Sequence, residues 1–145
     1  MLRLLQTVVY NVLINWYLGR GKTPPLQLLL DYFAVCPQHK EAWVAKIAVR
    51  EYPDEPYAQW LYSTQISDPV QKHKLLRHII DLMAVSDKCY SVEFGKLLAS
   101  EMVDFYLSVE DYGAVRQWYK LRQKMMERPD VEVFQILDWI DTPAD

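Results

Sequence analysis

A helical pattern that occurs twice constrains the fold of this chain more than any other feature of its sequence. Residues 57–85 and residues 94–128 each contain an aromatic-rich first helix, a short acidic turn and a second helix that ends near a polar break. In both copies apolar residues recur three and four positions apart, which gathers them on one face of an α-helix. The repetition predicts antiparallel helical hairpins that stack on one another, an arrangement more typical of binding proteins than of enzymes.

Proline and glycine mark the ends of the predicted helices. Gly19 and Gly21 end a first helix over residues 2–18, because glycine readily adopts the left-handed conformation of a helix cap. Asp68-Pro69 predicts the start of another helix, because aspartate caps free backbone N–H groups and proline suits the first helical position. We expect an all-α fold of seven or eight helices in a single domain over residues 1–145. Its expected parts are non-repeat helices in residues 1–52, two hairpins in residues 57–128 and a terminal capping helix over residues 131–141.

The two hairpins resemble tetratricopeptide repeats, which are helical units of about 34 residues. The first match runs from Tyr57-Ala-Gln-Trp-Leu through Asp68-Pro69 to Leu82. In the second, the matching aromatic and acidic positions are Tyr106, Asp111, Tyr112 and Tyr119. The sequence departs from the family at positions that prefer small residues, which are Val103, Val115 and Arg122. The resemblance covers about half of the chain and implies a short TPR-like array that binds a protein or peptide, usually in a concave groove.

The predicted helix over residues 2–18 is apolar around more than one side. A wide apolar face carries Leu2, Leu5, Val8, Val9, Val12, Leu13, Trp16 and Tyr17. Leu4, Tyr10 and Ile14 add apolar surface off that face. A single packed layer cannot cover both surfaces, so this helix is expected either to be buried on two sides or to pair with another chain. Tyr10 and Ile14 are the candidate residues for a homo-oligomer formed through this helix.

The residues able to perform catalysis or to bind metal do not form a recognisable group. The segment Gly19-Arg20-Gly21-Lys22-Thr23 resembles part of a phosphate-binding loop, but Trp16 stands where that pattern needs its first glycine. His73 and His78 are five residues apart, so they do not share a helical face as the two histidines of a zinc site do. We expect no enzymatic activity, no cofactor and no bound metal.

The composition predicts a cytoplasmic protein. Cys36 and Cys89 have no nearby cysteine or histidine at metal-ligand spacing, and we expect both to be reduced residues of the core. Polar residues, including Asn11 and Asn15, interrupt the apolar N-terminal segment, which disfavours a membrane-spanning helix. The net charge of −3 is mild and favours a protein partner over a nucleic acid.

Basic residues form a stripe on the second predicted helix of each hairpin. One stripe consists of Arg116, Lys120 and Lys124, and the other of Lys72, Lys74 and Arg77. In a regular stack both would lie on one side, where they could contact an acidic peptide or a nucleic-acid backbone. The alternative is an ordinary solvated face. Trp118 lies next to the first stripe, and if exposed it would be an apolar anchor for a partner.

These observations predict a non-catalytic interaction or adaptor module that binds a peptide or protein surface. A second hypothesis is a small phage- or mobile-element-type regulator that acts by occluding a partner. A third is a helical nucleic-acid-binding module that uses the two basic stripes.

Overall fold

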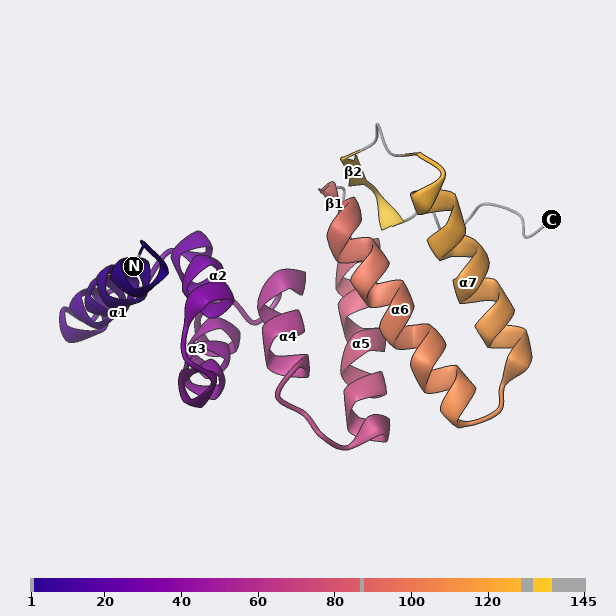
Figure 1. Cartoon of the computed structure of the whole chain (residues 1–145), viewed down its shortest axis with the longest axis horizontal. Helices are drawn as coiled ribbons and strands as arrows, with labels where there is room; N and C mark the ends of the chain where they lie inside the picture. Colours follow the sequence, from indigo (N-terminus) through magenta and orange to yellow (C-terminus); the bar gives the residue numbers. More distant parts are fainter. Residues whose placement is uncertain (1, 87, 129–131, 137–145) are drawn as a thin grey trace. The chain divides into compact units, whose positions relative to one another are not determined.

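The computed structural model of the chain describes residues 2–86, 88–128 and 132–136. Over these residues it contains seven α-helices and one small sheet of two strands, so the predicted all-α class is confirmed (Figure 1). The helices are α1 (Leu2–Gly19), α2 (Leu26–Val35), α3 (Gln38–Glu51), α4 (Pro56–Ser63), α5 (Pro69–Ala84), α6 (Val92–Ser108) and α7 (Tyr112–Met126). The strands are β1 (Tyr90–Ser91) and β2 (Val133–Phe134).

The chain divides into two compact units, Met1–Ser67 and Asp68–Asp145. Unit 1 contains α1 to α4, and unit 2 contains α5, α6, α7 and the two strands. The division falls between α4 and α5, the two helices of the first predicted hairpin. Pairing of these two helices in a tetratricopeptide-like repeat therefore stays a prediction.

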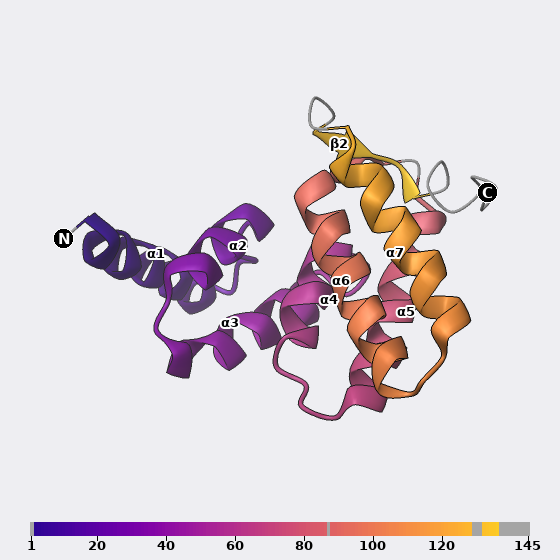
Figure 2. The same ribbon diagram turned by 45° about the vertical axis from the view of Figure 1, so that its right-hand side comes forward.

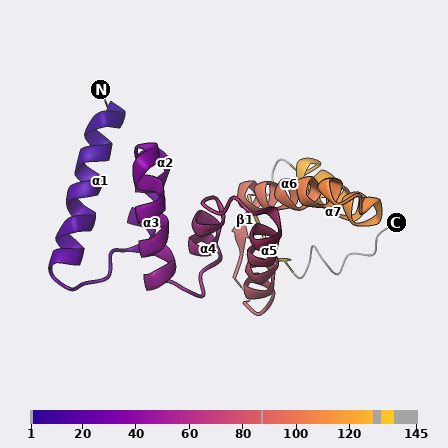
Figure 3. The ribbon, with the colours of Figure 1, turned by 90° about the horizontal axis from the view of Figure 1, so that it is seen from below.

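In unit 1 each helix packs against the next one along the chain (Figure 3). Short connections that contain proline separate α2 from α3 and α3 from α4. Proline interrupts the helix at these points because it lacks the backbone N–H group that would continue the hydrogen bonding. The four helices share one apolar core, and burying such side chains removes their apolar surface from water. Its buried members are Ile14, Leu29, Tyr32, Cys36, Val44, Ala45, Ile47, Ala48, Ala58 and Leu61.

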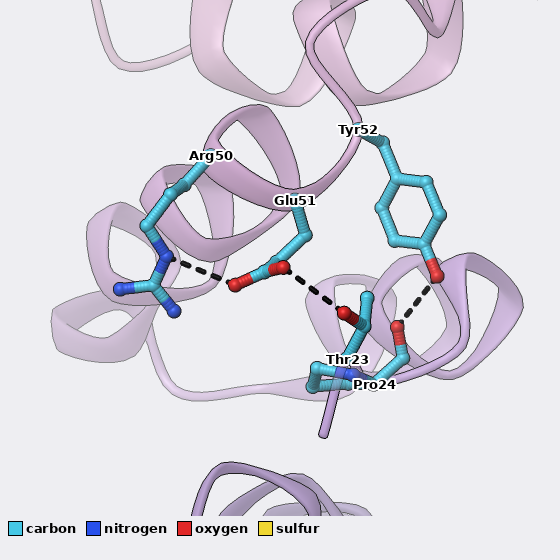
Figure 4. A network of polar contacts seen from close by, with 5 residues as sticks. All are labelled: Thr23, Pro24, Arg50, Glu51 and Tyr52. Carbon is cyan, nitrogen blue, oxygen red and sulfur yellow. Dashed lines mark hydrogen bonds and ion pairs between the residues drawn. The ribbon is translucent and has the colours of Figure 1, made fainter. Parts of the chain in front are cut away.

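Polar contacts fasten the connection between α1 and α2 to the end of α3 (Figure 4). The Thr23 hydroxyl donates to a carboxylate oxygen of Glu51 over 3.1 Å, and the other carboxylate oxygen of Glu51 accepts from Arg50 over 3.1 Å. The Tyr52 hydroxyl donates to the carbonyl oxygen of the buried Pro24 over 2.7 Å. These bonds hold in place the segment that follows α1.

In unit 2, α6 packs against both α5 and α7. Gly95 of α6 permits a close approach, because a Cβ atom there would lie 2.5 Å from Met125 Cε and 2.7 Å from Phe134 Cε1. The His73 ring of α5 stacks on Phe105 of α6, with ring centroids 3.9 Å apart. The strand β1, which directly precedes α6, pairs with β2 and completes the unit. Figure 2 shows β2 near the ends of α6 and α7.

Aspartate residues cap two helices of unit 2. Asp68 accepts a hydrogen bond from the backbone N–H of Val70, which confirms the helix start predicted at Asp68-Pro69. Asp111 accepts in the same way from the N–H of Ala114 at the start of α7. Each cap satisfies a backbone donor that has no partner within its helix.

The terminal helix predicted over residues 131–141 does not begin where the sequence pattern placed it, because residues 133–134 form a strand and Ile136 is the first described helical residue after that strand. Val133 and Phe134 form β2 and pair antiparallel with Ser91 and Tyr90, respectively. The carbonyl oxygen of Glu132 also accepts a hydrogen bond from the N–H of Val92. Bonds to a distant segment thus overrode the local helical spacing, and residues 137–141 lie outside the described residues.

Candidate binding surface

α1 packs against α2 through the side of the helix that carries polar residues. The Thr7 hydroxyl lies 3.1 Å from the Val35 carbonyl oxygen, and the Tyr32 hydroxyl lies 3.5 Å from the side-chain oxygen of Asn11. Ile14 lies on the same side and is fully buried. Thr7 is near the start of α1 and Val35 is at the end of α2, so these two helices run antiparallel.

The opposite side of α1 is apolar and exposed. Seven of its side chains are between 41% and 72% exposed, and together they are called the α1 apolar face. At about 100° per residue they fill a continuous arc of about 140°, and no charged residue of α1 lies within it. The α1 apolar face consists of Leu2, Leu5, Val8, Val9, Val12, Leu13 and Trp16.

The structure reverses the roles expected for the two sides of this helix. Ile14, predicted to support self-association, is 0% exposed and belongs to the core of unit 1, so that assignment is wrong. Tyr10 is half-buried and packs against the same core. Leu29 and Tyr32 of α2 are buried beneath α1, and the polar side can cover them because Thr7 and Asn11 find hydrogen-bond partners there.

Five residues of the α1 apolar face follow the spacing of a coiled-coil seam. Their positions alternate between three and four residues apart, as at the a and d positions of a heptad, and Val8 and Leu13 flank this row. The row consists of Leu2, Leu5, Val9, Val12 and Trp16. Such a row can interdigitate with apolar side chains of another helix that crosses it at a small angle.

Two cations lie beside Trp16, at the C-terminal end of the α1 apolar face. The guanidinium carbon of Arg20 is 4.5 Å from the centre of the Trp16 ring, and the ammonium nitrogen of Lys22 is 5.9 Å from it. Within the described part of the chain neither cation forms a salt bridge. The tryptophan ring and the negative end of the helix dipole stabilise these charges locally.

The basic stripe predicted on α7 is on its outer side. Arg116 and Lys120 are exposed and Lys124 is half-buried, whereas Leu121 on the other side of the helix is buried. Trp118 is only 6% exposed, so the prediction that it forms an exposed apolar anchor is wrong. Its position relative to the stripe explains the difference, because residues two positions apart project in different directions on a helix.

The stripe predicted on α5 is divided between the two sides of that helix. The Lys72 ammonium group forms a 3.3 Å salt bridge with Glu101 of α6. Lys74 and Arg77 are exposed. Their common side also carries exposed Asp81, which reduces the positive charge there.

Histidine and cysteine residues occupy separate environments. His73 Nε2 lies 3.1 Å from the Tyr106 hydroxyl, and burial together with the nearby Arg77 charge lowers the pKa of this imidazole. Cys36 is buried, but Cys89 is exposed, so the expectation that Cys89 belongs to the core is wrong. Over the described residues, no group of three or more His, Cys, Asp or Glu side chains is arranged to hold a metal ion.

The sequence of α1 distinguishes two sides of the helix, although not which of them is exposed. The wide apolar face of α1 is uninterrupted by polar residues, whereas Thr7 and Asn11 lie on the side of Ile14. Since hydrophobicity usually marks the buried side, the pattern alone favours the opposite assignment.

Comparison with known proteins gives no relative for this chain: no family model matches it, and neither does a curated protein or a solved structure. Among the helices that the structure describes, none combines the length and apolar character needed to cross a membrane.

Proposed function

We propose that the chain is a non-catalytic protein-interaction module whose docking surface is the α1 apolar face. One observation carries this proposal: seven neighbouring apolar side chains on one helix are substantially exposed. Scattered exposed apolar residues are normal on a protein surface, but a continuous patch rimmed by polar residues is typical of interaction sites. The opposite side of α1 is already packed against α2. Rotation of the helix about its axis could bury the apolar face only by exposing the buried Ile14.

The exposed area is sufficient for a reversible complex. Full burial of one apolar side chain contributes about 1.5–3 kcal/mol, and the seven side chains are roughly half exposed. Their burial would therefore contribute about 5–10 kcal/mol, and a matching partner surface would roughly double this figure. Association itself costs about 4–15 kcal/mol, so docking on this face is favourable when the partner contributes a matching apolar surface.

The basic stripe on α7 has a weaker claim to bind a partner. With Trp118 buried, Arg116 and Lys120 lack the adjacent apolar anchor that the sequence predicted. Exposed charges that act without apolar burial mainly affect the rate of encounter and its dependence on salt. We therefore assign the stripe an accessory role in attracting an acidic surface.

Placing charges on the α1 apolar face tests the proposal. The variant Leu5→Glu/Val12→Glu introduces two carboxylates into the centre of the face. The matched control is Leu97→Glu/Val70→Glu, which makes the same changes at exposed helical positions of α6 and α5. Each tagged protein would be recovered from the source cells, and the co-purified proteins would be quantified by mass spectrometry.

We expect wild type and the control to retain the same partner and the α1 variant to lose at least about 90% of it, which corresponds to roughly 1.4 kcal/mol or more. Circular dichroism and thermal unfolding would verify that both variants remain folded. Equal recovery of every partner by a folded α1 variant would contradict the proposal.

A further inference from the structure

We propose that the α1 apolar face binds an amphipathic α-helix of a different protein, and that acidic residues of that helix contact Arg20 and Lys22. The inference rests on the proposed function, because it specifies the partner of the same surface. Three features of α1 carry it: the spacing of its exposed apolar residues, the distribution of charge and the packing of its other side.

The spacing of the exposed residues fits a helical partner. The row from Leu2 to Trp16 alternates between intervals of three and four residues, which keeps an apolar seam facing a second helix along its length. α1 contains 18 residues and is therefore about 27 Å long. A helix that lies along the whole row would need about four turns of matching apolar positions, or two complete heptads.

The charge around the face determines the chemistry of the partner. Every charged residue in residues 2–22 is basic, and these are Arg3, Arg20 and Lys22. Two of the three lie beside Trp16 at the same end of the face. Carboxylates of a docked helix would complement these cations there, and this pairing would also fix the direction of the bound helix.

The same charges disfavour a second copy of the chain as the occupant. In a parallel pair of α1 helices, Arg20 and Lys22 would meet their own counterparts. In an antiparallel pair they would meet the first turn of the second helix, which carries no carboxylate to pair with them. The parallel arrangement places like charges together, and in neither arrangement do residues 2–22 supply an acidic residue that could pair with these cations.

The packing of α1 also favours a protein helix over a lipid surface. Helices that lie in the membrane interface usually carry many lysine and arginine residues along a polar side that faces water. In α1 the polar side instead faces α2 and forms hydrogen bonds through Thr7 and Asn11. The cations are concentrated near the ends of the helix, where they can pair with individual carboxylates.

Two synthetic helical peptides would test the inference against the full chain. Both contain 18 residues and the same leucine seam with three- and four-residue spacing. Three glutamates flank one end of the seam in the acidic peptide, and three lysines replace them in the basic peptide. Binding to wild type, to Arg20→Glu/Lys22→Glu and to Leu5→Glu/Val12→Glu would be measured by fluorescence anisotropy at low and high salt.

We expect wild type to bind the acidic peptide about tenfold or more tightly than the basic peptide at low salt, and the difference to shrink at high salt. Arg20→Glu/Lys22→Glu should prefer the basic peptide, and Leu5→Glu/Val12→Glu should lose binding to both. Equal affinity of wild type for both peptides would overturn the inference about charge, whereas loss of binding in the Leu5→Glu/Val12→Glu variant would still support docking on this face.

Other results would overturn the inference in favour of another occupant. Failure of wild type to bind either peptide would overturn the inference. If wild type then dimerised in sedimentation equilibrium and Leu5→Glu/Val12→Glu abolished the dimer, the occupant of the face would be a second copy of the chain. Co-sedimentation of wild type with vesicles of phosphatidylcholine and phosphatidylserine, without peptide binding, would identify a lipid surface. Peptide binding that is unchanged in Leu5→Glu/Val12→Glu would contradict both the inference and the proposed function.

Discussion

Replacement of Gly95 by alanine should destabilise unit 2, although alanine is normally favoured over glycine in a helix. Gly95 is buried in α6, and an alanine Cβ atom there would lie 2.5 Å from Met125 Cε and 2.7 Å from Phe134 Cε1. The methionine end is flexible and can move, but the Phe134 ring belongs to β2, which is paired with β1. The added methyl group therefore forces a shift of the contacts among α6, α7 and β2.

Gly113 provides a matched control for this substitution. It is also helical, but a Cβ atom there would meet only Asp111 Oδ1, at 3.8 Å. Both substitutions gain about 0.5–1 kcal/mol or somewhat less from reduced backbone freedom, and only Gly95→Ala incurs an overpacking cost of about 1–3 kcal/mol. We expect Gly95→Ala to be less stable than Gly113→Ala by about 1–3 kcal/mol.

Native-state hydrogen exchange of amides in α6 and α7 would measure this difference within unit 2. Thermal unfolding offers a second measure, since 1 kcal/mol corresponds to about 4–8 °C in a domain of 60–100 residues. If Gly95→Ala proved as stable as Gly113→Ala, the close packing of α6 against Met125 and Phe134 would be refuted.

Three further predictions concern local chemistry. Burial and the Arg77 charge lower the pKa of His73 from 6.5, so its neutral form stabilises unit 2 above pH 6.5 and this contribution is lost as pH falls through the folded-state pKa. The free energy of unfolding measured in urea should therefore fall with acidification more in wild type than in His73→Gln, and parallel pH profiles would contradict this. Asp111→Ala removes the cap of α7 and should lower the free energy of unfolding by about 1 kcal/mol, measured by urea denaturation; an unchanged midpoint and slope would show that the cap contributes nothing. Burial raises the pKa of the Cys36 thiol, so a thiol reagent at pH 8 should label exposed Cys89 much faster, as judged with Cys36→Ser and Cys89→Ser variants; equal rates would argue against burial of Cys36.

Local chemistry made most helix boundaries predictable from the sequence. Asp68-Pro69 begins α5, and α1 ends at Gly19, two residues before Gly21 adopts the left-handed conformation (φ 67°), because caps, proline and glycine act within one turn of the residues they affect. Periodic apolar residues between these signals were sufficient to predict the all-α class. The strand at Val133–Phe134 was missed because its hydrogen bonds join it to β1, more than 40 residues earlier.

Tertiary structure alone decided which side of each helix faces the core. The sequence of α1 contains two usable sides, and hydrophobicity favoured the wide apolar one, yet α2 covers the side with Thr7, Asn11 and Ile14. In α7, likewise, contact with α6 buried Trp118 and left Arg116 and Lys120 outside. Periodicity shows that a helix has distinct sides, but the side that is buried depends on the shape and hydrogen-bonding groups of the neighbouring helix.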